Sequence, residues 1–228
     1  PESSFQECYR EIPYPTNRER LTMPSQGRIY RDPKERLEDF CEVVLPFTLE
    51  QARYEASRCL NCKAPAECTK ACPVDNDIAT AMWYIAQGAI VEASRVFKRT
   101  CSFPEICGRI CPHEKLCEHA CLLNRNSVPT AIGALEAFAA DYERQHGVVE
   151  TPCGLPTGRR VAIVGGGPSG LACAERLMRA GHAITVFEMR PVPGGLMIYG
   201  IPGFKLESRY VFERMCDLAR SGVRFETG

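Results

Sequence analysis

The sequence of 228 residues has no excess of charge of either sign, because 28 basic residues balance 28 acidic ones. Nucleic acids and anionic membranes attract basic surfaces, so neither is an expected partner. The chain has no run of about 18 apolar residues that would span a bilayer. Residues 1–47 also lack the charged and then apolar order of a signal peptide. We therefore predict a cytoplasmic protein without membrane insertion, although the start at Pro1 indicates a processed or trimmed terminus.

Histidine is also scarce. The chain has four histidines, and no two of them share a spacing that would build a metal site or activate a nucleophile. We interpret them as core or solvent-facing residues and predict no catalytic histidine; they are His113, His119, His146 and His182.

Cysteine, by contrast, is abundant, and the 14 cysteines include two closely spaced groups. The first group is Cys59, Cys62, Cys68 and Cys72, with Pro73 after its last member. The second group is Cys107, Cys111, Cys117 and Cys121, with Pro112 after Cys111. The other cysteines lack such spacing and are interpreted as buried small residues or idle thiols: Cys8, Cys41, Cys101, Cys153, Cys173 and Cys216.

Metal ligation explains the two groups better than disulfides do, because an ordinary globular composition and a nucleotide-binding pattern indicate a reducing compartment. Short loops let neighbouring thiolates reach adjacent irons of an iron–sulfur cluster, and a proline after a ligand fixes the direction in which the chain leaves. The spacing also allows two structural zinc sites, and on spacing alone Cys107 can be a ligand.

The pattern of apolar and turn-forming residues divides the chain into three parts. Residues 1–47 contain scattered prolines and no sustained periodicity, which predicts an extended N-terminal arm. Residues 48–150 carry both cysteine groups and predict a helical domain with two clusters. Its helices are expected at 48–60, where Thr48 and Gln51 form a capping box, and at 77–86, 90–100 and 131–146.

A new domain is expected after residues 147–160, which are a linker by their proline and glycine content. Strands are predicted at 161–164, 184–188 and 223–226, and helices at 168–180 and 207–221. This order indicates an α/β doubly wound, Rossmann-like domain at residues 158–228. Only its first part is present, since such domains normally have about 100 residues or more.

A glycine-rich turn follows the first predicted strand and opens a helix. Glycines here permit a tight turn, close approach of a pyrophosphate and close packing of helix on strand, and the acidic end of the next strand can bond a ribose hydroxyl. The turn does not distinguish FAD from NAD, and a second glycine turn would suit an isoalloxazine or a phosphate. The residues assigned to this site are Gly165, Gly167, Pro168, Ser169, Gly170, Glu188, Arg190, Gly195 and Leu196.

Four stretches make the prediction more specific: residues 57–62 (SRCLNC), 72–74 (CPV), 103–112 (FPEICGRICP) and 194–202 (GGLMIYGIP). With them, the chain resembles an iron–sulfur flavoprotein family. That family includes the small subunit of NADPH-dependent glutamate synthase, the large subunit of NADH-dependent ferredoxin:NADP oxidoreductase and the N-terminal half of dihydropyrimidine dehydrogenase. The resemblance implies two [4Fe-4S] clusters and FAD, with NAD(P)H used by the full-length form.

The resemblance also implies which residues hold the clusters. One cluster would take Cys59, Cys62, Cys68 and Cys121, and the other would take Cys72, Cys111, Cys117 and Glu136, which leaves Cys107 unligated. In the family the last of these positions is Gln in pyrimidine reductases and commonly Glu in ferredoxin:NADP oxidoreductases. A solvent-facing helix glutamate is the alternative for Glu136. The loop from Cys62 to Cys68 has five intervening residues, where relatives usually have four.

The predicted function is electron transfer between NAD(P)H and FAD on one side and a partner on the other. The implied partner is a redox subunit, either similar to the glutamate synthase large subunit or a ferredoxin or flavoprotein subunit, in a hetero-oligomer. The alternatives are a non-catalytic relay or assembly module, the NAD(P)H-oxidising subunit of a pyrimidine reductase, and a zinc-stabilised scaffold that carries a nucleotide. The family's remaining FAD and NAD(P)H regions would follow Gly228, so the chain is either a fragment or a naturally short subunit.

Overall fold

The computed structural model describes residues 14–146 and 153–228. They form two compact units, one made of residues 14–30 and 45–146 and the other of residues 31–44 and 153–228. Cys8 and the predicted linker residues 147–152 lie outside the described residues.

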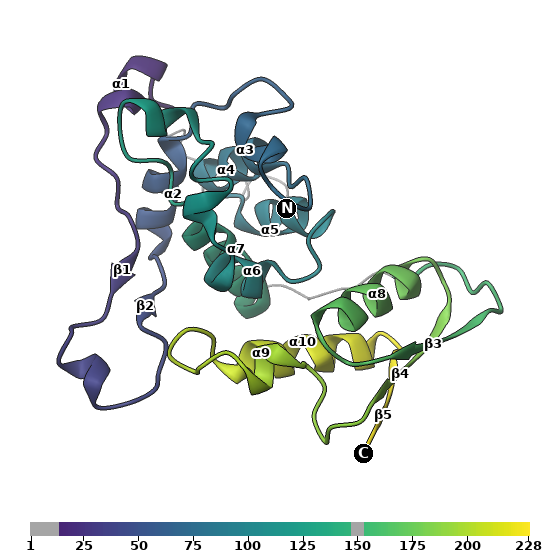
Figure 1. Cartoon of the computed structure of the whole chain (residues 1–228). Helices are drawn as coiled ribbons and strands as arrows, with labels where there is room; N and C mark the ends of the chain where they lie inside the picture. Colours follow the sequence, from purple (N-terminus) through teal and green to yellow (C-terminus); the bar gives the residue numbers. More distant parts are fainter. Residues whose placement is uncertain (1–13, 147–152) are drawn as a thin grey trace, which may run out of the picture. The chain divides into compact units, whose positions relative to one another are not determined.

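The first unit is helical (Figure 1). Its α-helices are α1 (Asn17–Thr22), α2 (Leu49–Ser57), α3 (Glu67–Lys70), α4 (Ile78–Gln87), α5 (Ile90–Lys98), α6 (Pro104–Ile110) and α7 (Ile132–His146). Two 3-10 turns, η2 (His113–Lys115) and η3 (Leu122–Arg125), connect α6 to α7. The four helices expected from periodicity are confirmed as α2, α4, α5 and α7.

Local sequence explains where these helices begin and end. Thr48 and Gln51 form the expected capping box of α2, with both reciprocal hydrogen bonds present. The Asp77 side chain caps α4, which ends at Gly88. Between these ends the helices bury apolar side chains in a shared core, including the fully buried Met82 and Leu135.

The second unit contains a parallel sheet of β3 (Arg160–Val164), β4 (Ala183–Glu188) and β5 (Arg224–Thr227), in that order. Helix α8 (Pro168–Arg179) packs against β3 and β4, and α10 (Ser208–Arg220) packs against α8. The short helix α9 (Leu196–Tyr199) precedes α10. The predicted alternation of strands and helices is confirmed, and it brings the carboxyl ends of β3 and β4 to one edge of the sheet.

Part of the predicted arm belongs to the second unit. Residues 31–44 contain the 3-10 turn η1 (Glu35–Leu37) and bond to α10 and to the segment before it. Val43 N donates to Phe204 O at 3.0 Å, and Tyr210 Oη of α10 donates to Glu42 Oε2 at 3.3 Å. The short strands β1 (Ile29–Tyr30) and β2 (Val44–Leu45) flank this stretch and pair with each other. Helix α1 also lies within the arm, where periodicity predicted no helix.

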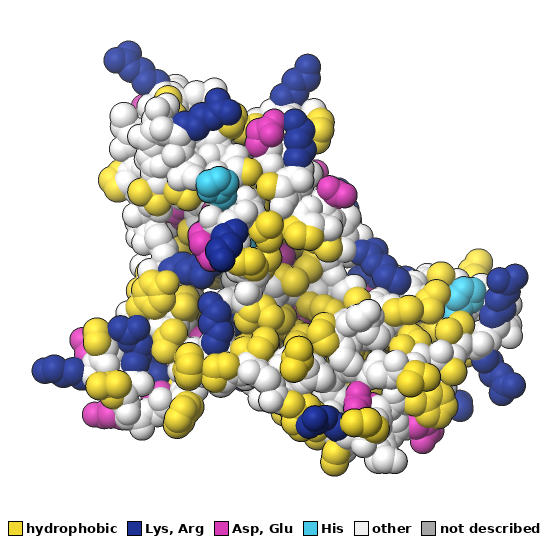
Figure 2. Space-filling view, viewed as in Figure 1, with side chains coloured by type: hydrophobic (Ala, Val, Ile, Leu, Met, Phe, Trp, Pro, Cys, Tyr) yellow, Lys and Arg dark blue, Asp and Glu magenta, His cyan; other side chains and the backbone are white. Residues whose placement is uncertain are grey.

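The surface agrees with the balanced charge of the sequence. Figure 2 shows the Lys and Arg side chains scattered over the visible face rather than gathered in one patch. Across the described ranges, no helix combines the length and the apolar character needed to cross a bilayer.

Candidate functional site

Four of the predicted cysteine ligands line a single apolar cavity in the first unit. They are Cys59, Cys62, Cys68 and Cys121, and side chains such as Ile78 and Met82 form the rest of the wall. The end of α2 supplies the first of these thiols, α3 supplies Cys68, and the start of η3 supplies Cys121. The fold therefore brings together one thiol of the second group and three of the first, as the resemblance implied.

Burial controls the chemistry of these thiols. It raises the pKa of both Cys59 and Cys68 to about 12, and the neighbouring thiols of the same set add to the effect. Without a cation the Cys59 and Cys68 thiols are therefore neutral, whereas bound iron would stabilise their thiolates. The thiols line the walls of a space, and among the described residues no three His, Cys, Asp or Glu side chains are arranged to hold a single metal ion. An apolar cavity walled by thiols fits a cuboid cluster.

The other predicted set also converges. Burial raises the pKa of Cys111 to about 11, and nearby Cys107, Glu136 and Cys72 add to this shift, in that order. Burial likewise raises the pKa of Cys117, and Glu136 and Cys72 again contribute. Each of these thiols is thus within electrostatic range of the Glu136 carboxylate, so the residues present fit a centre with mixed thiolate and carboxylate ligands.

Glu136 is buried in the first unit and does not face solvent. Its side chain lies on α7 with 5% of the residue exposed, and this burial raises the pKa of the carboxyl group. Asn76 Nδ2 donates to Oε1 at 3.4 Å, while His113 Nε2 lies 3.9 Å from Oε2. A buried carboxylate near Cys111 and Cys117, with two polar side chains beside it, is an arrangement suited to ligation.

Close helix packing positions this second set. Gly108 of α6 lies against α7, because a Cβ built on it would be 2.5 Å from Ala137 N and 2.7 Å from Gly133 O. The contact brings Cys111, at the end of α6, toward Glu136 on α7. Glu118 Oε1 accepts a hydrogen bond from Gly133 N at 3.0 Å, which attaches the loop between Cys117 and Cys121 to the start of α7.

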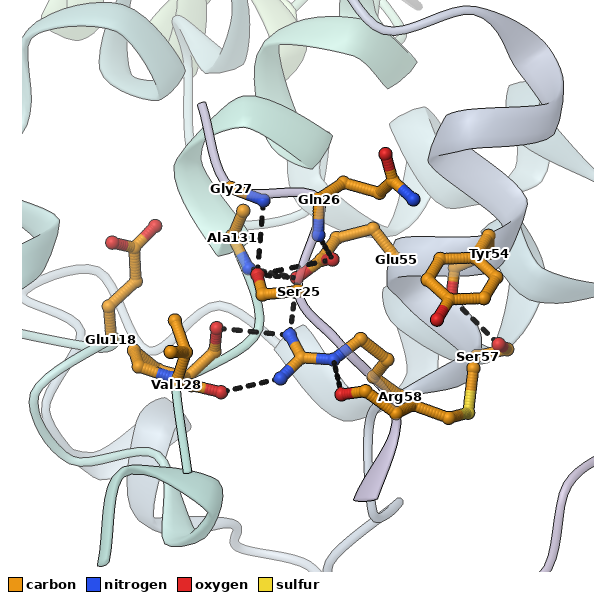
Figure 3. A network of polar contacts seen from close by, with 12 residues as sticks. Ser25, Gln26, Gly27, Tyr54, Glu55, Ser57, Arg58, Glu118, Val128 and Ala131 are labelled. Carbon is orange, nitrogen blue, oxygen red and sulfur yellow. Dashed lines mark hydrogen bonds and ion pairs between the residues drawn. The ribbon is translucent and has the colours of Figure 1, made fainter. Parts of the chain in front are cut away.

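A buried ion pair holds the end of α2, next to Cys59 (Figure 3). Arg58 Nη1 lies 2.7 Å from Glu55 Oε1, and neither side chain is exposed. The guanidinium also donates to the carbonyl oxygens of Met23 and Val128, at 3.1 and 2.6 Å. Glu55 in turn accepts from Ala131 N at 2.9 Å. The network therefore joins the arm, the cysteine-bearing end of α2 and the loop before α7.

Cys107, which spacing alone left open, lies beside another cysteine. Cys101 is buried, and a hydrogen bond with Cys107 raises the pKa of the Cys101 thiol, as does burial. Both cysteines are free thiols in the described structure. Of the other unassigned cysteines, Cys41, Cys153, Cys173 and Cys216 are free and exposed, so of the two expected alternatives these four fit idle thiols and not buried small residues.

The glycine turn lies between β3 and α8 in the second unit. A Cβ on Gly170 would lie 1.9 Å from Gly165 O, so glycine is required there for close packing of helix on strand. A Cβ on Gly167 would meet only Gly195 Cα, at 4.0 Å, so the space above Gly167 is open to a ligand. Pro168 and Ser169 form the first turn of α8 behind this opening, where backbone amides suit an anion.

Glu188 and the second glycine turn complete this edge of the sheet. Glu188 Oε2 accepts from Gly166 N at 2.7 Å, and Oε1 accepts from Arg190 N at 2.9 Å. These two amides hold the pKa of Glu188 below its ordinary value, so the carboxylate is ionised beside the turn. A Cβ built on Gly195 would lie 2.9 Å from Gly167 Cα, so packing of the two turns by itself disfavours a side chain at residue 195.

The rim of the turn is apolar and exposed. Val164, which precedes the turn, is 91% exposed, and Met189 and Leu196 are 83% and 73% exposed. Arg190 stacks over the Tyr199 ring, with Cζ 4.5 Å from the ring centroid. Open backbone at Gly167 with apolar side chains around it fits a ligand that has both a pyrophosphate and an aromatic ring.

Sequence reasoning missed the residues that surround the predicted ligands, namely Asn76, His113, Glu55 and Arg58. Their partners are distant in the sequence, and no fixed spacing marks them. A single sequence signal was available for Arg58, which directly precedes Cys59 and sits three residues after Glu55.

Comparison with known proteins also divides the chain into a part with the cysteine groups and a part with the glycine turn. Residues 36–148 match the family described as dihydropyrimidine dehydrogenase domain II, 4Fe-4S cluster. Residues 163–209 match the family of NAD(P)-binding Rossmann-like domains. The chain thus has a 4Fe-4S domain followed by a Rossmann-like domain.

Individual relatives include two glutamate synthase [NADPH] small chains. The one from Azospirillum brasilense is 40% identical over 205 residues, which are 87% of this chain and 42% of the relative. The one from Escherichia coli is 39% identical over 189 residues, 82% of this chain and 40% of the relative. The putative oxidoreductase UacF of Escherichia coli is 38% identical over 192 residues, 84% of this chain and 30% of that protein. The chain therefore spans less than half the length of these relatives.

Proposed function

We propose that the chain is the electron-transfer part of an NAD(P)H-dependent oxidoreductase, because residues 36–148 match the family described as dihydropyrimidine dehydrogenase domain II, 4Fe-4S cluster. Electrons pass between a flavin in the Rossmann-like unit and a partner protein through two [4Fe-4S] clusters. The chain is similar to part of two glutamate synthase small chains, so the proposed partner is a large chain of that kind, in a hetero-oligomer.

The two ligand sets are proposed from the convergence of the side chains. One cluster is held by the four thiols that share a cavity, Cys59, Cys62, Cys68 and Cys121. The other is held by Cys72, Cys111, Cys117 and Glu136. Each cluster, when bound, accepts and donates one electron at a time. The surrounding protein excludes water and fixes the ligands, and a carboxylate in one set separates the potentials of the two centres.

The proposed flavin is FAD at the glycine turn. Gly167 leaves its backbone open to the pyrophosphate, Ser169 and Pro168 place the first turn of α8 behind it, and Glu188 is ionised close to where a ribose would bind. FAD supplies the exchange between a hydride and single electrons. NAD(P)H is the proposed electron donor of the full-length protein.

One observation carries this proposal more than any other. Cys121 lies some 50 residues or more along the chain from Cys59, Cys62 and Cys68, yet all four thiols line one cavity. Interleaving of two cysteine groups between sites is a feature of two-cluster iron–sulfur proteins.

One experiment tests which cofactors are bound and whether electrons reach the proposed partner. The chain is purified without oxygen, released cofactors are identified by their absorbance and fluorescence, and EPR spectra are recorded after reduction with dithionite. We expect FAD and signals from two clusters, and we expect the reduced chain to transfer electrons to an oxidised glutamate synthase large chain. Release of NADP⁺ in place of FAD would contradict the flavin assignment, and failure of the large chain to accept electrons would contradict the partner assignment.

A second candidate is a relay or assembly module without its own flavin, which the short span of the chain relative to its relatives favours. The same experiment distinguishes it. Two clusters with no bound FAD, even after incubation with excess FAD, would support the relay.

A further inference from the structure

His113 is buried against α7, in contact with a glycine. The residue is 1% exposed, and a Cβ built on Gly133 would lie 2.3 Å from its Cε1 and 2.6 Å from its Nε2. Such distances are too short for any side chain at residue 133. Glycine therefore allows the imidazole to lie on α7 less than one turn before Glu136.

Arg28 determines which nitrogen of this ring carries the proton. Its Nη2 lies 2.9 Å from His113 Nδ1. A guanidinium donates hydrogen bonds and cannot accept them, so Nδ1 is the acceptor and the neutral ring carries its proton on Nε2.

The protonated nitrogen faces the Glu136 carboxylate. His113 Nε2 is buried without a hydrogen-bond partner among the described residues, and it lies 3.9 Å from Glu136 Oε2. On the other oxygen, Oε1, the Asn76 amide already donates at 3.4 Å, and its own carbonyl oxygen accepts from Thr100 Oγ1 at 2.6 Å. Oε1 thus has a hydrogen-bond donor, whereas the Nε2–H faces Oε2 from 3.9 Å and makes no hydrogen bond to it in this structure.

We propose that His113 is a positioning residue for Glu136: its Nε2–H, fixed by Arg28, orients the carboxylate and sets the reduction potential of the one cluster that Glu136 ligates. The inference deepens the proposed function, because it takes Glu136 as a ligand. A hydrogen bond to a ligand draws electron density from it and favours the reduced cluster.

Direct ligation by His113 would need a different arrangement. A histidine binds a metal through an unprotonated nitrogen. With Nδ1 occupied by Arg28, the ring would have to give up that bond or lose the Nε2 proton. The geometry therefore favours the role of donor.

The experiment is an anaerobic redox titration of the cluster-loaded chain, monitored by EPR, on His113→Phe and on His119→Phe. Phenylalanine keeps an aromatic ring on Gly133 and removes the donor, while His119 is exposed and serves as the matched control. In His113→Phe we expect the midpoint of one cluster to fall by about 59 mV, which is a tenfold change in a one-electron equilibrium. The other cluster, and both clusters of His119→Phe, should keep their midpoints.

The outcomes separate this inference from the proposed function. If the unmodified chain does not give EPR signals from two clusters, the proposed function is wrong. If it shows both and His113→Phe leaves both midpoints unchanged, the positioning role is wrong. Conversion of one cluster to a three-iron form would also overturn it, because His113 would then be a ligand.

A second variant keeps the inference testable if His113→Phe assembles no clusters. Arg28→Gln leaves the ring in place and removes the bond that fixes its tautomer. We expect the same midpoint to fall, by less than in His113→Phe, and an unchanged midpoint would overturn the inference.

Discussion

Glycines 167 and 170 occupy the same turn for different reasons. Gly170 is needed by the protein itself, because a Cβ would collide with Gly165 O. Gly167 has an ordinary φ of −76° and free space above it, so a side chain there would meet no protein atom closer than 4.0 Å. No protein contact requires glycine at residue 167, and we propose that the ligand does.

This difference predicts the behaviour of two variants. Gly167→Val should fold with both clusters bound and lose the dinucleotide, since its side chain fills the space for the pyrophosphate. Gly170→Ala should lose stability, because helix and strand must separate. Flavin content and thermal unfolding of each variant check this prediction. A flavin that stays bound to Gly167→Val would refute the assignment of the phosphate turn.

Glu136 gives a second prediction for a single residue. In Glu136→Cys the iron content should be kept, since a thiolate is a good ligand, and the midpoint of one cluster should shift while the other stays constant. Potentiometric titration by EPR measures both in one sample, so the second cluster is an internal control. If neither midpoint moves, Glu136 is not a ligand.

The predictable part of the site was the part with fixed spacing. The cysteine spacing predicted thiol ligation, and the resemblance added Glu136, whose side chain the structure places near Cys111 and Cys117. Asn76 and His113 could not be predicted, because they meet Glu136 only after the segments before α4 and after α6 pack near α7, and contacts between distant residues leave no spacing in one sequence.

At the scale of elements, the buried pair Glu55 and Arg58 joins three segments at the cysteine-bearing end of α2. Arg58→Met should lower the free energy of unfolding by about 3–5 kcal/mol, since it leaves a buried carboxylate without its cation. Lys70→Met is the matched control, because Lys70 and Glu67 have the same three-residue separation but are about half exposed. Its expected effect is about 0–1 kcal/mol.

Urea unfolding of the cluster-free variants measures the loss in free energy of unfolding for Arg58→Met and for Lys70→Met. Equal effects of the two substitutions would show that the buried network does not anchor α2. Loss of the network should also slow iron incorporation at the cavity of Cys59, which can be followed by absorbance during reconstitution.

Element length explains which helices were predictable. The helices α2, α4, α5 and α7 contain nine to fifteen residues, enough for an apolar repeat to show. The helices α1, α3, α6 and α9 contain four to seven residues, which is less than two full turns, and none was predicted. Helix α1 has a capping box, whereas α3, α6 and α9 have no side-chain cap and are stabilised by packing within their unit, which a periodic pattern does not report.

For the whole molecule, the metal-free state should depend on pH through its buried thiols. Burial raises the pKa of Cys59 and Cys68 to about 12 from the ordinary value of 9.0. Neutral thiols are thus favoured in the fold, so their contribution to stability is complete below pH 9.0 and is lost as the pH rises toward 12.

We therefore expect the urea concentration at which half of the metal-free chain is unfolded to be lower at about pH 11 than at about pH 8. The cluster-loaded chain should fall less, because its thiols are already ionised and bound to iron. Unfolding curves of both forms at the two pH values provide the comparison. A fall of equal size in the two forms would show that these thiols are not the titrating groups.

The central claim is that one short chain holds two [4Fe-4S] clusters and a flavin. The most direct test is the content of iron, acid-labile sulfide, zinc and FAD per polypeptide after purification without oxygen. The account predicts about eight irons and about eight sulfides, with one FAD and no stoichiometric zinc. Stoichiometric zinc without sulfide would contradict it, because the two cysteine groups would then be structural sites that cannot carry electrons.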